Sequence, residues 1–167
     1  MQLDAANFRY RHPRGILYGY ITESGLRALQ LPHPEKPLHP HLLHSAPNIV
    51  LGRALHFALD TYFAGHPEDF AAIPLDLTGA TAFQTRVWQA ARQIPWGTTI
   101  AYGQLARRLG LPATAGRAVG RALAVNPIHL LIPCHRILAA NGHLTGFAAG
   151  LAWKQALLQQ EGLTPTR

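Results

Sequence analysis

The chain contains one cysteine, Cys134, within the run Leu-Ile-Pro-Cys-His-Arg-Ile at residues 131–137. The thiolate is the nucleophilic form of cysteine, and a free thiol is only a few per cent ionised at neutral pH. His135 is a candidate base, but adjacent side chains of an extended segment point to opposite faces, so coupling would need a bend or a bridging water. A Cys-His dipeptide by itself is equally compatible with a buried structural cysteine beside a surface histidine.

A catalytic histidine also needs a third group that orients its ring. Glu161 is the only acidic residue after position 80. A carboxylate for this site must therefore be Glu161 or come from the first half of the chain.

Charge divides the chain into two unlike halves. Residues 1–80 have a net charge of −1 and residues 81–167 a net charge of +8, with histidine counted as neutral. This asymmetry predicts a polyanionic partner for the second half, either nucleic acid or an anionic surface. The alternative is a basic half that serves only solubility.

Composition excludes several classes of protein. One cysteine cannot form a disulfide framework and gives no zinc-binding spacing. No apolar run reaches about 18 residues and no signal peptide is evident, so we expect a cytoplasmic protein, nucleoid-associated if prokaryotic, without membrane contact. We expect no cofactor and no metal. The one weak metal candidate is a proline-rich segment that contains His33, His39, His41 and His44.

The order of predicted elements indicates an α/β fold with two domains. We expect residues 1–78 to form a small α/β domain with a short antiparallel sheet, and to support the rest of the chain structurally. We expect residues 79–167 to form a mainly helical domain that contains a helix-turn-helix and carries the DNA-binding and reactive groups. The boundary is placed where the prolines, acids and glycine of residues 66–80 precede the change of charge.

Three elements are predicted in the first half. Alternation of apolar and polar residues over 7–31, with two turn signals, predicts an antiparallel meander. Residues 32–47 are so rich in proline and histidine that we expect a loop. A helix over 48–65 is predicted to begin at Asn48 and to bury one face. That face contains Val50, Leu51, Leu55, Ala58, Leu59 and Tyr62.

The second half is predicted to begin and end with helices. Thr81 and Gln84 form a capping box, and Pro95 is expected to stop the helix that they begin. Its buried stripe is predicted to contain Phe83, Val87, Ala90, Ala91 and Ile94. A final helix over residues 150–161 ends at Gly162, which is in position for a C-terminal cap. Trp88, Trp96 and Trp153 are most simply core residues.

Between these helices lie two shorter ones, over residues 99–110 and 113–126, joined by a Gly/Pro turn that indicates a helix-turn-helix. No acid neutralises the basic side chains of this pair, which are Arg107, Arg108, Arg117 and Arg121. The second helix is unusually smooth because Gly116 and Gly120 share a face. Close packing against another helix would explain one glycine; the other interpretation is a thin helix that enters the DNA minor groove.

Two stretches resemble one family. The chain is similar to the O6-alkylguanine-DNA alkyltransferases at residues 126–137 (NPIHLLIPCHRI) and 144–162 (LTGFAAGLAWKQALLQQEG). The Pro-Cys-His-Arg core, followed by an aliphatic residue, is highly specific to that family. The resemblance runs from about Thr81 to Gly162, and the first half is similar only in its general α/β style. It implies that Cys134 accepts the alkyl group as a thioether.

The same resemblance implies further roles. His135 would deprotonate the thiol through a water, Glu161 would orient His135, and Asn126 would hold the water and support the turn. Tyr102 would rotate a DNA phosphate and serve the flipped base, and Arg117 would fill the vacancy in the stack. The implied DNA-binding set is Tyr102, Arg107, Arg108, Gly116, Arg117, Gly120, Arg121 and Arg136. The implied base pocket and its lid contain Pro133, Leu144, Gly146, Phe147, Ala148 and Lys154.

The resemblance implies repair of O6-alkylguanine in double-stranded DNA, with O4-alkylthymine as a second candidate substrate and no protein partner. A modified base must leave the duplex before its O6 substituent can be reached. A thioether has no simple exit, so we expect one turnover per molecule. Two alternatives stay open: a non-catalytic protein that recognises lesions and recruits excision repair, and a cysteine hydrolase that uses Cys134, His135 and Glu161.

Overall fold

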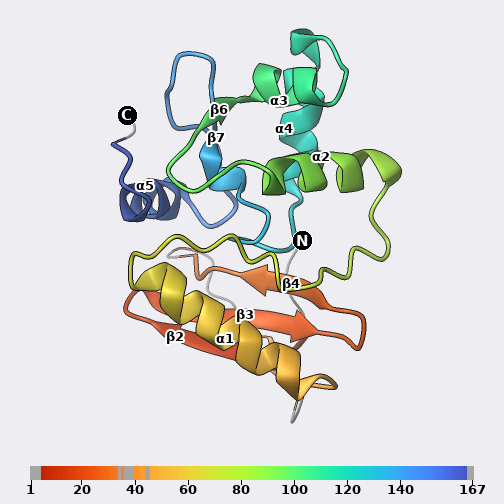
Figure 1. Cartoon of the computed structure of the whole chain (residues 1–167), viewed down its shortest axis with the longest axis vertical. Helices are drawn as coiled ribbons and strands as arrows, with labels where there is room; N and C mark the ends of the chain where they lie inside the picture. The colour runs from red at the N-terminus through yellow and green to blue at the C-terminus, as the bar shows by residue number, and fades with distance from the viewer. Residues whose placement is uncertain (1–4, 34, 36–39, 44–45, 165–167) are drawn as a thin grey trace. The chain divides into compact units, whose positions relative to one another are not determined.

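A computed structural model describes residues 5–33, 35, 40–43 and 46–164. The chain forms two compact units. The first contains residues 1–78 and 127–129, and the second contains residues 79–126 and 130–167. The fold is α/β, as the sequence predicts, with a sheet in the first unit and mainly helices in the second (Figure 1).

The first unit is built on the predicted meander. Strands β2 (Phe8–His12), β3 (Gly15–Ile21) and β4 (Leu26–Gln30) pair antiparallel in that order. Gly25 has φ of +151°, and a Cβ there would lie 2.5 Å from the Pro74 carbonyl oxygen, so this turn requires glycine. Helix α1 (Ile49–Phe63) lies across one face of this sheet (Figure 1).

Helix α1 begins as predicted, because the Asn48 side chain accepts a hydrogen bond from the Leu51 amide. The expected buried face is confirmed for Leu51, Leu55, Ala58, Leu59 and Tyr62. The prediction for Val50 is wrong, since this side chain is 79% exposed. At 100° per residue it points well away from the stripe that its neighbours form.

Two pairings in the first unit were not predicted. Strand β1 (Ala5–Ala6) pairs parallel with β5 (His41–Leu42), so the segment expected to be a loop contains a short strand. In addition, the Leu29 amide donates to the Pro127 carbonyl, and the His129 amide donates to the Leu29 carbonyl. These hydrogen bonds explain why residues 127–129 group with the first unit, although we expected them in the second domain.

In the second unit, helix α2 (Ala82–Arg92) begins with the predicted capping box of Thr81 and Gln84. It ends at Arg92, before the expected stop at Pro95. Its buried residues are Val87, Trp88 and Ala91, whereas Phe83 and Ala90 are only half-buried. The indole N–H of Trp88 donates to the Ala122 carbonyl at 2.9 Å, which ties α2 to the helix pair.

The helix pair consists of α3 (Tyr102–Arg108) and α4 (Gly116–Ala124), joined by a turn that includes the 3-10 segment Ala113–Ala115. The predicted helix-turn-helix is therefore present. The first helix starts later than expected because Ile100 and Ala101 form strand β6, which pairs parallel with β7 (Ile137–Leu138). Strand β7 directly follows the cysteine segment.

The chain closes with helix α5 (Leu151–Gln160), followed by Gly162 at φ +79° as the predicted cap. Trp88 and Trp153 are buried, as expected, and Trp96 is half-buried. Within the part of the chain that the structure describes, no helix has the length and apolar character needed to cross a membrane.

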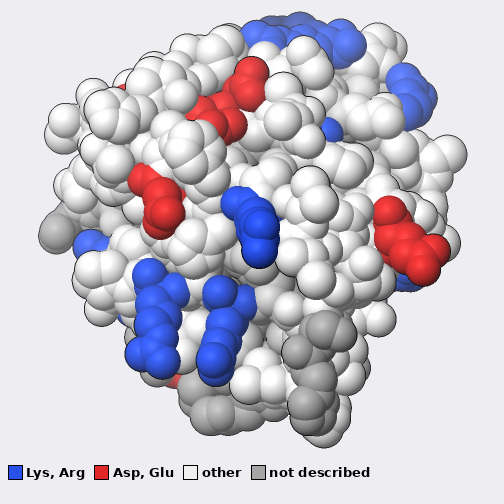
Figure 2. All heavy atoms as spheres, turned by 60° about the horizontal axis from the view of Figure 1, so that its bottom comes forward, with Lys and Arg blue, Asp and Glu red and all other residues white. Residues whose placement is uncertain are grey.

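The face drawn in Figure 2 carries basic and acidic side chains side by side. Every acidic residue except the buried Glu161 precedes position 80, so the acids visible there belong to the first unit. This face is therefore not a surface of one charge.

Candidate active site

Cys134 begins a single 3-10 turn that runs to Arg136. Pro133 precedes the turn with φ of −78°, and its carbonyl accepts a hydrogen bond from the Arg136 amide at 3.0 Å. This turn supplies the bend that the Cys-His pair needs, because neither side chain is held in an extended strand. Cys134 is 8% exposed, and His135 is completely buried.

The side chain of Asn126 supports the turn. Its Nδ2 donates to the Ile132 carbonyl at 2.9 Å and to the Sγ of Cys134 at 3.3 Å. Burial raises the pKa of the Cys134 thiol, while the bond from Asn126 and the charge of Lys154 act in the opposite direction. The resting cysteine is therefore a neutral thiol that needs a base.

His135 lies against Glu161, as the sequence predicts. The distance between the His135 Nε2 and the Glu161 Oε1 is 2.7 Å, with both side chains fully buried. Burial lowers the pKa of His135, although the bond to Glu161 opposes this shift. Burial would raise the pKa of Glu161, but the bonds from His135 and Arg136 outweigh it and lower that pKa to about 2. The pair is a neutral imidazole on a carboxylate, which is suited to take up a proton.

Arg136 does not lie where we expected it. The prediction that it contacts DNA does not fit its position, because it is 4% exposed and donates to both oxygens of Glu161. Its Nη1 also donates to the Ile94 carbonyl at 2.6 Å. Arg136 therefore belongs to the buried charge network behind the cysteine.

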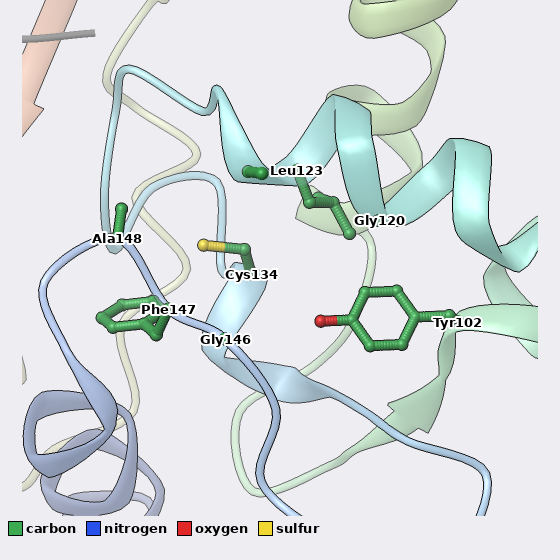
Figure 3. Close-up of a pocket in the computed structure, with 8 residues that line it drawn as sticks. Tyr102, Gly120, Leu123, Cys134, Gly146, Phe147 and Ala148 are labelled. Atoms are coloured by element: carbon green, nitrogen blue, oxygen red, sulfur yellow. The ribbon is translucent and has the colours of Figure 1, made fainter.

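A pocket of about 360 Å³ opens beside the cysteine. In Figure 3 the Sγ of Cys134 points to the side where Ala148 and Phe147 lie, and the Tyr102 hydroxyl points toward Cys134 from the opposite side. The lining residues are Tyr102, Gly120, Leu123, Ala124, Cys134, Gly146, Phe147 and Ala148. The pocket thus brings the thiol of Cys134, the hydroxyl of Tyr102 and the aromatic ring of Phe147 together in a space that fits a small ligand.

Of the predicted lid, Gly146, Phe147 and Ala148 line this pocket, whereas Leu144 does not. Pro133 and Lys154 are also absent from its lining. Lys154 instead lies fully buried behind the lid, where its Nζ donates to the Ile137 carbonyl at 2.7 Å and to the Thr145 carbonyl at 3.1 Å. Burial lowers its pKa to about 8.

The arginines of the helix pair are exposed, and so are available to a polyanion. These are Arg107 and Arg108 on α3, and Arg117 and Arg121 on α4. The two glycines of α4 differ. A Cβ at Gly116 would lie 3.3 Å from the Gly103 amide nitrogen, so this glycine allows close packing of the helices. Gly120 lines the pocket.

The sequence predicted a lid segment over residues 144–148 but not the role of Thr145 within it, nor that Leu123 and Ala124 line the pocket. Thr145 donates from its Oγ1 to the Tyr102 hydroxyl at 3.3 Å, which joins the lid to α3. Leu123 and Ala124 line the pocket from α4. Helical spacing from Gly120 was a usable signal for both, since residues three and four apart share a helix face. No local signal pointed to the hydroxyl of Thr145.

No cluster of three or more metal-ligating side chains occurs among the residues that the structure describes. Of the four histidines considered for a metal, His39 and His44 lie outside the described residues.

Residues 82–163 match the family model described as 6-O-methylguanine DNA methyltransferase, DNA binding domain. The methylated-DNA–protein-cysteine methyltransferase of Mycobacterium leprae is 52% identical over 103 residues, which cover 62% of this chain and 61% of that protein. The Mycobacterium bovis protein of the same name is 42% identical over 127 residues, which cover 76% and 75%. The chain thus spans less than two thirds of the first relative and three quarters of the second.

Solved structures extend the similarity to the first unit. The structure of Mycobacterium tuberculosis OGT in complex with DNA matches with a TM-score of 0.78 at 38% identity, over 92% of this chain and 90% of that chain. A match over most of both chains means that the sheet-containing first unit is shared as well as the helical second unit.

Proposed function

The chain belongs to the methylated-DNA–protein-cysteine methyltransferase family, and from this premise we propose that it repairs DNA by moving an alkyl group from O6 of guanine to Cys134. The observation that carries this proposal is the Sγ of Cys134 at the wall of a ligand-sized pocket, with His135 and Glu161 buried behind it. Cys134 is 8% exposed and lines this pocket, where a base could enter.

In the proposed reaction the thiol proton passes through a water to His135. Because the Nε2 of His135 is bonded to Glu161, Nδ1 is the ring nitrogen that accepts this proton. An electron pair of Sγ then forms the S–C bond as the C–O6 bond breaks in line. The electrons of the broken bond pass to the guanine, which takes up a proton to become the normal base.

The departing guanine needs its developing charge stabilised. The Tyr102 hydroxyl points into the pocket and is suited to donate to the purine ring (Figure 3). Backbone N–H groups of the lid, near Phe147 and Ala148, are suited to donate near O6. The small side chain of Ala148 leaves that backbone accessible.

The proposed substrate is alkylated guanine in double-stranded DNA, with O4-alkylthymine as a second candidate. A base must be flipped out of the stack to reach a pocket of this kind, at a cost of a few kcal/mol that is smaller for a badly paired lesion. We assign the DNA contact to α4, placed in the minor groove, with Arg117 filling the vacated stack. Supporting this, the four exposed arginines of the helix pair have no acidic neighbour in the sequence, and the DNA complex named above belongs to a 38% identical protein.

We propose a single turnover. The product is a thioether, which is chemically inert, and Cys134 is the only cysteine, so no second thiol is present to regenerate it. Each molecule would repair one lesion.

The test is incubation with duplex DNA that carries one O6-methylguanine, followed by mass measurement of the tryptic peptides. The expected result is one methyl group on the Cys134 peptide, with guanine restored and the reaction ending after one equivalent. Cys134→Ala is the control, which should bind the duplex but gain no mass. Tight binding by the wild type without any mass gain would overturn the proposal and favour a lesion-recognition protein.

A further inference from the structure

The carboxylate of Glu161 accepts more hydrogen bonds from Arg136 than it shares with His135. The Nε of Arg136 donates to Oε2 at 2.9 Å and to Oε1 at 3.2 Å, and its Nη2 donates to Oε1 at 2.9 Å. The third guanidinium nitrogen, Nη1, is anchored on the Ile94 carbonyl at 2.6 Å. All three nitrogens of the guanidinium are therefore in use, and none is available to DNA.

Both oxygens of Glu161 are fully engaged by this arrangement. Oε1 accepts from Arg136 and lies 2.7 Å from the Nε2 of His135, and Oε2 accepts from Arg136 and from the Gly97 amide at 3.3 Å. Rotation of the carboxylate would break several of these hydrogen bonds at once. The oxygen that faces His135 thus has one position, set by the planar fork of the arginine.

We propose that Arg136 is a positioning residue for alkyl transfer, which fixes Glu161 and through it holds the His135 ring in the tautomer with its proton on Nε2, so that Nδ1 is the nitrogen that accepts the thiol proton. This inference rests on the proposed function, in which His135 accepts the thiol proton. A buried ion pair contributes little to stability compared with apolar residues of similar size, so a purely structural reason for Arg136 is weak.

The charges around His135 give Arg136 a second effect. Glu161 favours the protonated imidazole, whereas the cations Arg136 and Lys154 disfavour it. Cys134 precedes His135 in the chain. The segment after α2 contributes only backbone groups to this network: the Ile94 carbonyl accepts from Arg136, and the Gly97 amide donates to Glu161. Arg136 therefore offsets the carboxylate, and its removal should make His135 easier to protonate, so that less of the ring is in the neutral, proton-accepting form at acid pH.

The experiment compares Arg136→Gln with Arg136→Lys in single-turnover transfer from an O6-methylguanine duplex between about pH 6 and pH 8, where histidine titrates. Arg136→Gln removes the charge, so the acid limb of the rate profile should move to higher pH, and the loss of rate should be greater near the acid end. Arg136→Lys keeps the charge but loses the fork. It should lower the rate across the whole range with little movement of the acid limb.

If Arg136 served packing alone, both variants would lose the same fraction of the transfer rate at every pH. That result would overturn the inference. If Arg136→Gln does not fold, nitrogen NMR of His135 in Arg136→Lys decides the question. The expected spectrum shows a mixture of ring tautomers where the wild type has one, and an unchanged tautomer together with an unchanged rate would refute the inference. The wild type is measured first, so a protein that fails to transfer the methyl group refutes the proposed function instead.

Discussion

The side-chain amide of Asn126 donates one hydrogen bond to the Sγ of Cys134 at 3.3 Å and a second to the Ile132 carbonyl at 2.9 Å. The first bond stabilises the thiolate, and the second holds the backbone two residues before the cysteine. One side chain therefore connects the shape of the turn to the ionisation of the Cys134 thiol.

Replacement of Asn126 by alanine should raise the pKa of Cys134 further. Burial already raises this pKa, and the bond from Asn126 is the largest opposing effect. A hydrogen bond to a charged group contributes about 1.5–3 kcal/mol, so we expect a rise of about one pKa unit or more. The pH dependence of iodoacetamide alkylation measures it, because the protein has no other cysteine.

The control for this experiment is Asn141→Ala, which changes an exposed asparagine outside the site. It should leave the alkylation profile unchanged. A Cys134 profile in Asn126→Ala that coincides with the wild type would show that the 3.3 Å contact has no influence on the thiolate.

Cys134 is the candidate reactive group because the Pro-Cys-His-Arg run resembles one family; the Cys-His dipeptide alone was equally compatible with a structural cysteine. With one cysteine and one acid in the second half, Cys134 and Glu161 had few competitors. The structure places Glu161 at 2.7 Å from His135, as expected. Arg136 was included in the implied DNA-binding set, and nothing local in the sequence shows that this charged side chain is buried against an acid 25 residues away.

Elements defined by local signals were predicted better than those defined by distant pairing. The cap at Asn48 and the capping box of Thr81 are short-range patterns, and both are present. Strand β6 was predicted as the start of a helix because its partner, Ile137, lies far along the chain. The same limit applies to residues 127–129, whose pairing with Leu29 depends on tertiary structure rather than propensity.

The buried pair should make the protein sensitive to acid through Glu161. Its pKa falls from an ordinary 4.5 to about 2 in the folded protein. A depressed carboxyl pKa contributes stability above the unfolded pKa, and this contribution is lost as the pH falls from there through the folded pKa. The shift corresponds to about 3 kcal/mol. Urea unfolding of the wild type and Glu161→Gln, from neutral pH down to about pH 3, should therefore show a flatter acid dependence in the variant.

Glu161→Gln should also be less stable at neutral pH, because it leaves Arg136 buried without its carboxylate, at a cost of about 3–5 kcal/mol. Glu23→Gln, at an exposed position, is the matched control and should behave as the wild type does. If the free energy of unfolding of Glu161→Gln fell with pH as steeply as that of the wild type, a group other than Glu161 would cause the acid sensitivity.

The two glycines of α4 should respond differently to alanine. A Cβ at Gly116 would lie 3.3 Å from the Gly103 amide nitrogen and 3.4 Å from the Tyr102 Cβ, whereas one at Gly120 would lie 3.6 Å from the Tyr102 ring. We expect Gly116→Ala to lower the free energy of unfolding by about 1 kcal/mol, since backbone atoms must shift. Gly120→Ala should raise it by up to about 1 kcal/mol, the helix preference of alanine over glycine.

The rate of alkyl transfer should be lowered in Gly120→Ala, although this variant is expected to be the more stable of the two. Gly120 lines the pocket, so its extra methyl group should slow alkyl transfer in a protein that is no less stable. Urea unfolding and single-turnover transfer, measured on the same samples, test both statements. A Gly120→Ala protein that transfers at the wild-type rate would mean that the base does not approach this face of α4.

Thr145 should control the rate through the Tyr102 hydroxyl. Its Oγ1 donates to that hydroxyl at 3.3 Å, and its carbonyl is fixed by the Nζ of Lys154 at 3.1 Å. Thr145→Val keeps the shape of the side chain but cannot donate, so both the lid and the hydroxyl of Tyr102 lose a constraint. A hydrogen bond contributes about 0.5–1.5 kcal/mol, which predicts transfer slower by about two- to tenfold.

Thr145→Ser distinguishes the hydroxyl from the methyl group of this side chain. It retains the donor, so its rate of transfer from an O6-methylguanine duplex should return close to the wild-type value, while Thr145→Val stays slow. Urea unfolding should be similar for all three proteins, because Thr145 is only half-buried. If the serine variant were slow and the valine variant transferred at the wild-type rate, the methyl group of Thr145 would matter rather than its bond to Tyr102, and the lid would be positioned by packing.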